Sequence, residues 1–140
     1  MQKAPLTSAE SERVASQLAA AVVLARAAYT GDSEELPSLA RLDTTWLAWQ
    51  GDRSKSRPDA NAVVNSLGIA FGKHVATSLM LDWFIVTDEF GTDLAIFGEP
   101  GAVTFFPANM IAKRLKEKSP IFTQLHRAAV ESVKQLRSQL

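Results

Sequence analysis

The sequence predicts an α+β fold in which three helices, a three-stranded antiparallel meander and two more helices follow one another. Three observations support this order. Apolar residues recur at intervals of three and four over much of the first 80 positions, which is typical of amphipathic helices. Three short runs rich in aromatic and β-branched residues then follow, separated by turns that contain glycine. Finally, a proline lies at the start of each of the last two helical segments.

The first predicted helix covers Ser8–Tyr29. Thr7, followed three residues later by Glu10, forms a capping box, the pattern in which two residues satisfy free amides at a helix start. Gly31 is well placed to end the helix. The apolar run 18–28 is too short to cross a bilayer and is interrupted by Arg26, so we predict an amphipathic helix and no targeting segment.

A second helix is predicted between Pro37 and Gly51, because its large apolar residues share one face. They are Leu39, Leu42, Trp46 and Trp49. The next segment, 51–59, combines turn-forming residues with three basic ones and has no apolar side chain to bury. We therefore expect a mobile surface loop there.

The third helix, which begins at about Asp59, is predicted to be the central one. Six large apolar residues lie on its inner face. They are Val63, Val64, Leu67, Phe71, Val75 and Leu79. Gly68 and Gly72 on the same helix cost it roughly 2 kcal/mol in propensity, so we expect another element to pack closely along them.

Three strands are predicted at Trp83–Thr87, Leu94–Phe97 and Val103–Phe106. Their connections are too short for the crossovers that parallel strands require, so the strands should form an antiparallel meander.

Two helices are predicted after the strands, and we expect both to pack on one face of the sheet. The first begins with Pro107 and runs to about Lys116. The second has Ser119 as N-cap and Pro120 at its first position. Its predicted inward residues are Phe122, Leu125, Ala129, Val133 and Leu136.

Three stretches resemble a known family. They read NSLGIAFGKHVATSLMLDW, VTDEFGTDLAIFG and VTFFPANMIAKR, and they lie between Val63 and Arg114. Together they resemble the bacterial family called domain of unknown function 3806. The resemblance implies a small bacterial α+β domain and carries over no activity.

Length and composition narrow the range of functions. The 140 residues fit a single globular domain, 1–140, that can bury about two thirds of the surface its unfolded chain would expose. The absence of cysteine excludes disulfides, thiolate catalysis and cysteine-bound metals, and it favours a cytoplasmic location. The 15 basic and 15 acidic residues balance, so we expect neither nucleic acid nor membrane as partner. We also expect no cofactor and no metal.

Acidic residues gather around the predicted strands. The stretch 82–99 contains five acids and no Lys or Arg, while basic residues dominate the last two helices. Asp88, Glu89 and Asp93 surround Gly91, but their spacing matches no calcium loop. Asp and Gly are also ordinary turn residues, whose carboxylates accept bonds from nearby amides, and we favour that structural interpretation.

The leading functional hypothesis is a non-enzymatic protein-binding module. In one form it is a bacterial immunity or adaptor protein that occludes the active site of a toxin. Phe90 at the hairpin tip is the aromatic residue we expect to be exposed. The hypothesis assigns partner binding to Asp88, Glu89, Phe90, Asp93 and Glu99.

Two alternatives remain open. The first is a ligand- or metal-binding sensor, or an enzyme, with a pocket between the meander and the third helix. That pocket would be lined by His74, Asp88, Asp93 and Lys113. The second is a homo-oligomeric structural module that associates through the second or last helix. Against catalysis, the sequence has no nucleophile elbow, no phosphate loop and only two histidines, His74 and His126, which we interpret as structural.

Overall fold

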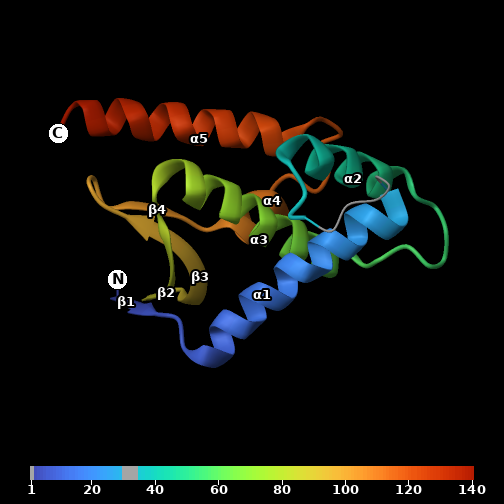
Figure 1. Cartoon of the computed structure of the whole chain (residues 1–140), viewed down its shortest axis with the longest axis horizontal. Helices are drawn as coiled ribbons and strands as arrows, with labels where there is room; N and C mark the ends of the chain where they lie inside the picture. The colour runs from blue at the N-terminus through green and yellow to red at the C-terminus, as the bar shows by residue number, and fades with distance from the viewer. Residues whose placement is uncertain (1, 30–34) are drawn as a thin grey trace.

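The computed structural model describes residues 2–29 and 35–140, which form five α-helices, one π-helical segment and a four-stranded sheet (Figure 1). The α+β class is confirmed, whereas the predicted number of three strands is wrong. In chain order the elements are β1 (Gln2–Pro5), α1 (Ser8–Val23), η1 (Leu24–Tyr29), α2 (Leu39–Gly51), α3 (Ala60–Leu79), β2 (Asp82–Asp88), β3 (Gly91–Gly98), β4 (Val103–Phe105), α4 (Pro107–Ala112) and α5 (Ile121–Ser138).

Helix α1 begins as the sequence predicts. The Thr7 amide donates to Glu10 Oε1 over 2.8 Å, and the Glu10 amide donates to Thr7 Oγ1 over 3.2 Å, which completes the capping box. The α-helix ends at Val23, however, and the chain continues as the π-helical segment η1. The predicted end at Gly31 lies outside the described residues.

Helix α3 is central, as predicted, because it contacts α1, α2, α4, α5 and β3. Its two glycines allow the close approach that we expected. A Cβ at Gly68 would lie 2.9 Å from Ala108 Cα, and a Cβ at Gly72 would lie 2.6 Å from Pro107 Cγ and 2.7 Å from Trp83 Cη2. Helix α4 therefore packs along the glycine face of α3, and Trp83 joins it there from the sheet.

The core is built around aromatic side chains from three helices. The Phe122 ring meets Trp46 and Phe71 edge-on, with ring centroids 5.8 and 5.9 Å apart. Trp46, Phe71 and Phe122 are all fully buried. The ring centroids of Trp49 and Trp46 are 5.4 Å apart, and Trp49 is buried, as predicted.

The sheet is antiparallel in the order β1-β2-β3-β4. The unpredicted strand, β1, pairs with β2 from Gln2↔Thr87 to Pro5↔Phe84. All four β1 residues are exposed and include a proline, so no alternation of apolar and polar residues marks the strand in the sequence. The Lys3 ammonium lies 3.3 Å from the centre of the Phe97 ring, on the outer face of the sheet.

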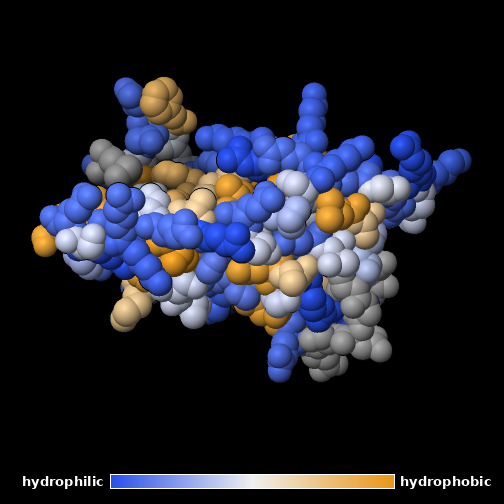
Figure 2. Space-filling view, turned by 90° about the horizontal axis from the view of Figure 1, so that it is seen from above, coloured by the Kyte–Doolittle hydropathy of each residue, from blue (hydrophilic) through white to orange (hydrophobic). Residues whose placement is uncertain are grey.

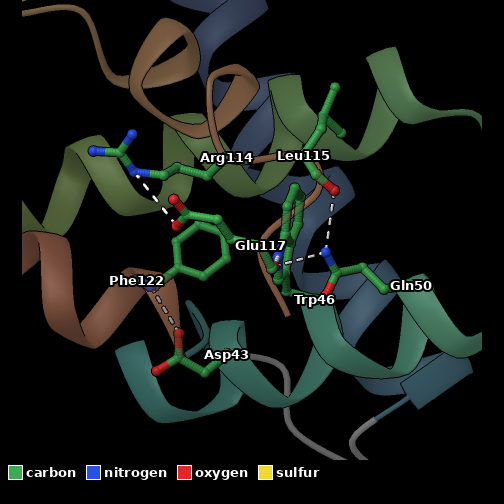
Figure 3. A network of polar contacts seen from close by, with 7 residues as sticks. All are labelled: Asp43, Trp46, Gln50, Arg114, Leu115, Glu117 and Phe122. Atoms are coloured by element: carbon green, nitrogen blue, oxygen red, sulfur yellow. Dashed lines mark hydrogen bonds and ion pairs between the residues drawn. The ribbon is translucent and has the colours of Figure 1, made fainter. Parts of the chain in front are cut away.

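Helix α4 is shorter than predicted, ending at Ala112 and not near Lys116. A side chain of α2 explains the early end. Gln50 Nε2 donates to the carbonyls of Leu115 and Glu117, over 3.2 and 2.8 Å, and so stabilises a non-helical path between α4 and α5 (Figure 3).

The start of α5 also differs from the prediction, since the N-cap position is Pro120 and not Ser119. Pro120 provides no side-chain cap. The carboxylate of Asp43, on α2, takes that role from across the core and accepts the amide of Phe122 over 2.8 Å (Figure 3). Its other oxygen accepts the amide of Thr123 over 3.3 Å. It also accepts the Thr123 hydroxyl.

The prediction that both C-terminal helices cover one face of the sheet needs correction. Helix α5 packs mainly on α2 and α3 and runs over the helical layer (Figure 1). At its far end Arg137 donates to the carbonyls of Pro100, in the β3–β4 turn, and of Leu79, the last residue of α3, over 3.0 and 2.9 Å. Leu136, predicted to face inward, is 41% exposed. Its side chain lies against the β3–β4 turn, where a Cβ at Gly101 would be 3.2 Å from Leu136 Cδ2. The face that carries α5 is mostly hydrophilic (Figure 2).

Candidate functional site

The tip of the β2–β3 hairpin carries the most exposed aromatic side chain in the described part of the chain. Asp88 pairs with Gly91, which leaves Glu89 and Phe90 as a two-residue turn. Gly91 adopts φ +128°, a value that favours glycine. Phe90 is 89% exposed, as predicted, and its amide donates to Asp88 Oδ1 over 2.8 Å. The backbone role expected for this aspartate is therefore confirmed.

A groove of about 300 Å³ opens beside the tip, and we call it the acidic groove. Its lining residues are Val86, Asp88, Phe90, Gly91, Thr92, Asp93, Phe106 and Asn109. Asp93 is held in place from two sides, because Oδ1 accepts the amide of Leu94 over 2.9 Å and Oδ2 accepts Asn109 Nδ2 over 2.7 Å. Two carboxylates and two phenyl rings thus surround a space that is open to solvent.

Glu99 lies apart from the other residues assigned to partner binding. It follows the end of β3, in the β3–β4 turn, where its carboxylate accepts the amide of Ala102. The eight residues of β3 separate it from Phe90 by roughly 26 Å, at 3.3 Å per residue. The structure therefore brings Asp88, Glu89, Phe90 and Asp93 together and leaves Glu99 at the opposite end of the sheet.

A second groove lies between the sheet and the helices, near the place predicted for a ligand pocket. We call it the sheet–helix groove, and its volume is about 280 Å³. It is lined by Glu10, Arg13, Val14 and Gln17 of α1, Asn65 and Ile69 of α3, Ile85, Asp93 and Leu94 of the sheet, and Ala108 of α4. Ile85 and Leu94 are paired neighbours on β2 and β3, so their side chains share the face that forms its floor.

Only one of the four residues predicted for that pocket lines this groove. Asp93 does, whereas Asp88 faces the acidic groove. His74 lies next to the segment that precedes α2. Its Nε2 donates to the Pro37 carbonyl over 2.7 Å, since that oxygen can only accept. Lys113 is exposed at the C-cap of α4. The sequence could not reveal the groove's true lining, because three of its five polar residues, Glu10, Arg13 and Gln17, come from α1.

The two histidines come close to one another, which the sequence did not indicate. His74 and Ser78 lie one turn apart on α3, and Ser78 Oγ lies 2.9 Å from His126 Nε2 of α5. Burial and then the neighbouring His74 lower the pKa of His126, while a backbone hydrogen bond at His74 opposes the shift. The pair links α3 to α5, and the hydrogen bonds of the two imidazoles among the described residues go to the Pro37 carbonyl and the Ser78 hydroxyl.

The surface loop after α2 is tied to the helix more closely than its composition suggests. Trp49 Nε1 donates to the Pro58 carbonyl over 2.8 Å, and the Arg57 guanidinium stacks 4.1 Å from the Trp49 ring centre. The Tyr29 hydroxyl donates to Asp52 Oδ2 over 2.9 Å. The pKa of Tyr29 is raised, mainly by burial of the phenol and secondly by this hydrogen bond.

Two further features of the described part of the chain concern clusters of metal-binding side chains and membrane-spanning helices. Across residues 2–29 and 35–140, no three His, Cys, Asp or Glu side chains are grouped so as to hold a metal ion. No helix among the same residues is long and apolar enough to cross a bilayer.

Comparison with known proteins identifies the family of the chain but no individual curated protein or solved structure that resembles it. Residues 43–124, more than half of the sequence, match the family described as domain of unknown function (DUF3806). The match begins at the aspartate that caps α5 and ends within the first turn of that helix, so it includes α3, strands β2 to β4 and α4. The chain belongs to the DUF3806 family.

Proposed function

We propose that this protein is a non-enzymatic protein-binding module that recognises a basic partner through the β2–β3 hairpin. The observation that carries the proposal is the exposure of Phe90, 89%, at a turn beside the acidic groove. A single exposed apolar side chain is ordinary by itself, so the proposal depends on the combination of Phe90 with the carboxylates of the groove beside it. Aromatic residues are also enriched among the side chains that dominate binding energy.

The groove beside Phe90 specifies the chemistry of the partner. An arginine or lysine side chain placed there would meet the carboxylates of Asp88 and Asp93 and the faces of Phe90 and Phe106. Glu89, exposed at the tip, adds a third negative charge. Such a surface suits a partner with a basic cleft. An immunity or adaptor protein that occludes a toxin's active site is the form of this function that we propose.

The carboxylates of Asp88 and Asp93 can bind a partner because each makes few hydrogen bonds within the protein. Asp88 uses one oxygen for the Phe90 amide, and Asp93 holds one hydrogen bond on each oxygen. Each carboxylate oxygen can accept a further bond, so both side chains can accept a partner's cation without breaking the turn.

Affinity purification of the tagged protein from its own host, with mass spectrometry, tests the proposal. The variant combines Phe90→Ala with Asp88→Lys. A matched control combines Met80→Ala, which removes another exposed apolar side chain (85%), with Glu131→Lys on α5. We expect a stoichiometric basic partner that is retained by the control, and a dissociation constant raised about 100-fold or more in the hairpin variant.

The proposal fails under either of two results. One is recovery of the protein without a partner at native expression levels. The other is a partner whose affinity for the hairpin variant equals its affinity for the control. Equal thermal stability of the two variants, measured beforehand, ensures that a loss of binding reflects the surface. Sedimentation of the purified protein separates this function from the homo-oligomeric alternative.

A further inference from the structure

We propose that the sheet–helix groove binds a small zwitterion with an apolar body, of the class to which apolar α-amino acids belong. This site is distinct from the hairpin surface, and the inference goes beyond protein binding. Among the described residues, Asp93 alone lines both grooves.

The floor of the groove is apolar and already formed. Val14 and Ile69 are 8% and 5% exposed, and Ile85, Leu94 and Ala108 are half-buried beside them. These side chains come from two helices, two strands and the short helix α4, so the floor depends on the complete fold. Burial of a ligand's branched or aromatic body against it would supply the apolar part of the affinity.

The rim supplies donors that the protein itself does not use. The side chains of Arg13, Gln17 and Asn65 have no hydrogen-bond or ion-pair partner among residues 2–29 and 35–140. Arg13 and Gln17 lie one turn apart on α1, across from Asn65 on α3. A guanidinium with all five N–H groups free is suited to hold a carboxylate by two parallel bonds.

Acceptors at the rim favour a ligand that also carries a positive charge. Glu10, Asp93 and Arg13 all line the groove, so its lining residues carry one positive and two negative charges. A simple organic anion would be attracted by one of these groups and repelled by two. A zwitterion satisfies both signs, with its carboxylate on Arg13 and its ammonium toward the acidic side chains.

Groove volume limits the size of the ligand. At about 280 Å³ the space lies just below the range of roughly 300–1,000 Å³ that small-molecule sites occupy. A single amino acid therefore fits the groove better than a peptide does, because one of the two charged termini of a peptide would lie outside the groove.

Nuclear magnetic resonance titration of the full chain with leucine, valine and phenylalanine tests the inference. The matched probes are the N-acetyl derivatives, which lack the ammonium, and the amides, which lack the carboxylate. We expect saturable shifts at groove residues for at least one amino acid, with a dissociation constant about tenfold or more below those of its two derivatives. Arg13→Gln should raise that constant about tenfold, to the value of the amide. Arg127→Gln, on the exposed side of α5, should leave it unchanged.

Three results would overturn the inference. They are no shifts at the groove with any of the three amino acids at millimolar concentration, equal affinity for parent and derivative, and an unchanged constant in Arg13→Gln. Tighter binding of the amides alone would point to a peptide N-terminus, and tighter binding of the N-acetyl forms to a C-terminus; either excludes the zwitterion. The hairpin variant Phe90→Ala with Asp88→Lys should bind the amino acid normally, so this site and the proposed protein-binding function can fail separately.

Discussion

The contact between α2 and α5 and the tip of the β2–β3 hairpin use the same residue types in opposite ways. In the first region Asp43 is 6% exposed and its carboxylate caps α5, while Gln50 and Trp46 bind the carbonyls before it. In the second region Asp88 and Phe90 are exposed, and the carboxylate stabilises only its own turn.

This contrast separates side chains that hold the fold from side chains that can bind a partner. A buried polar group without a hydrogen bond costs about 1–3 kcal/mol. The Asp43 carboxylate, the Trp46 indole N–H and the Gln50 amide nitrogen each bond a backbone group. Gln50 Oε1, in contrast, is buried without a hydrogen-bond partner among the described residues. Solvent satisfies the polar groups at the tip and at the rim of the sheet–helix groove. Those groups can exchange water for a ligand, and the predictions below test this difference.

The largest expected effect is the loss of the cap from α5. Asp43→Ala leaves the amides of Phe122 and Thr123 without an acceptor inside the protein and should lower the free energy of unfolding by about 3 kcal/mol. Asp88→Ala, which removes a surface carboxylate that accepts one amide of its own turn, should lower the free energy of unfolding by less than about 0.5 kcal/mol. Urea unfolding measures both. Equal effects would contradict the distinction between the two regions.

A smaller effect is expected from filling the contact between α3 and α4. Gly72→Ala places a Cβ 2.6 Å from Pro107 and 2.7 Å from Trp83, and the strain should outweigh the gain in helix propensity by about 1–2 kcal/mol. The matched control is Gly51→Ala, where no atom lies within 4 Å and the change should stay within about 0.5 kcal/mol. Unchanged or raised stability of the Gly72 variant would show that α4 can move away from α3 at little cost.

The smallest expected effect concerns His126. Its pKa in the folded protein is lowered from 6.5, so the unfolded chain binds the proton more readily. The contribution of this histidine to stability is therefore complete above pH 6.5 and is lost as the pH falls through the range below it. Urea unfolding at about pH 7.5 and 5.5 should show a decrease that His126→Gln reduces and Arg127→Gln does not. An equal change in the free energy of unfolding between the two pH values in both variants would show that other groups cause the pH dependence.

Much of the fold follows from local patterns in the sequence. Helix α3 and its glycine contact, the β2–β3 hairpin and the capping box of α1 all depend on residues a few positions apart. The sequence-based predictions of three features were wrong because residues distant in the sequence supply their hydrogen bonds. The end of α4 depends on Gln50, the cap of α5 on Asp43, and β1 on the free edge of β2.

The candidate sites divide in the same way. Phe90 could be recognised as exposed because the turn that carries it is encoded within six residues. The sheet–helix groove could be placed only roughly, since Arg13 and Asn65 lie some 50 positions apart in the sequence and meet only when α1 packs on α3. The contact of Ser78 with His126 spans 48 positions and left no sequence signal.

The sequence alone therefore determined the α+β class, the central helix, the meander and its exposed tip, because periodicity, capping and turn chemistry act over a few residues. Tertiary structure decided which face α5 covers, which carboxylate caps it, and which side chains meet in the sheet–helix groove. These outcomes depend on contacts between segments far apart in the chain, where a buried amide or carbonyl accepts whichever partner the packed helices bring within reach.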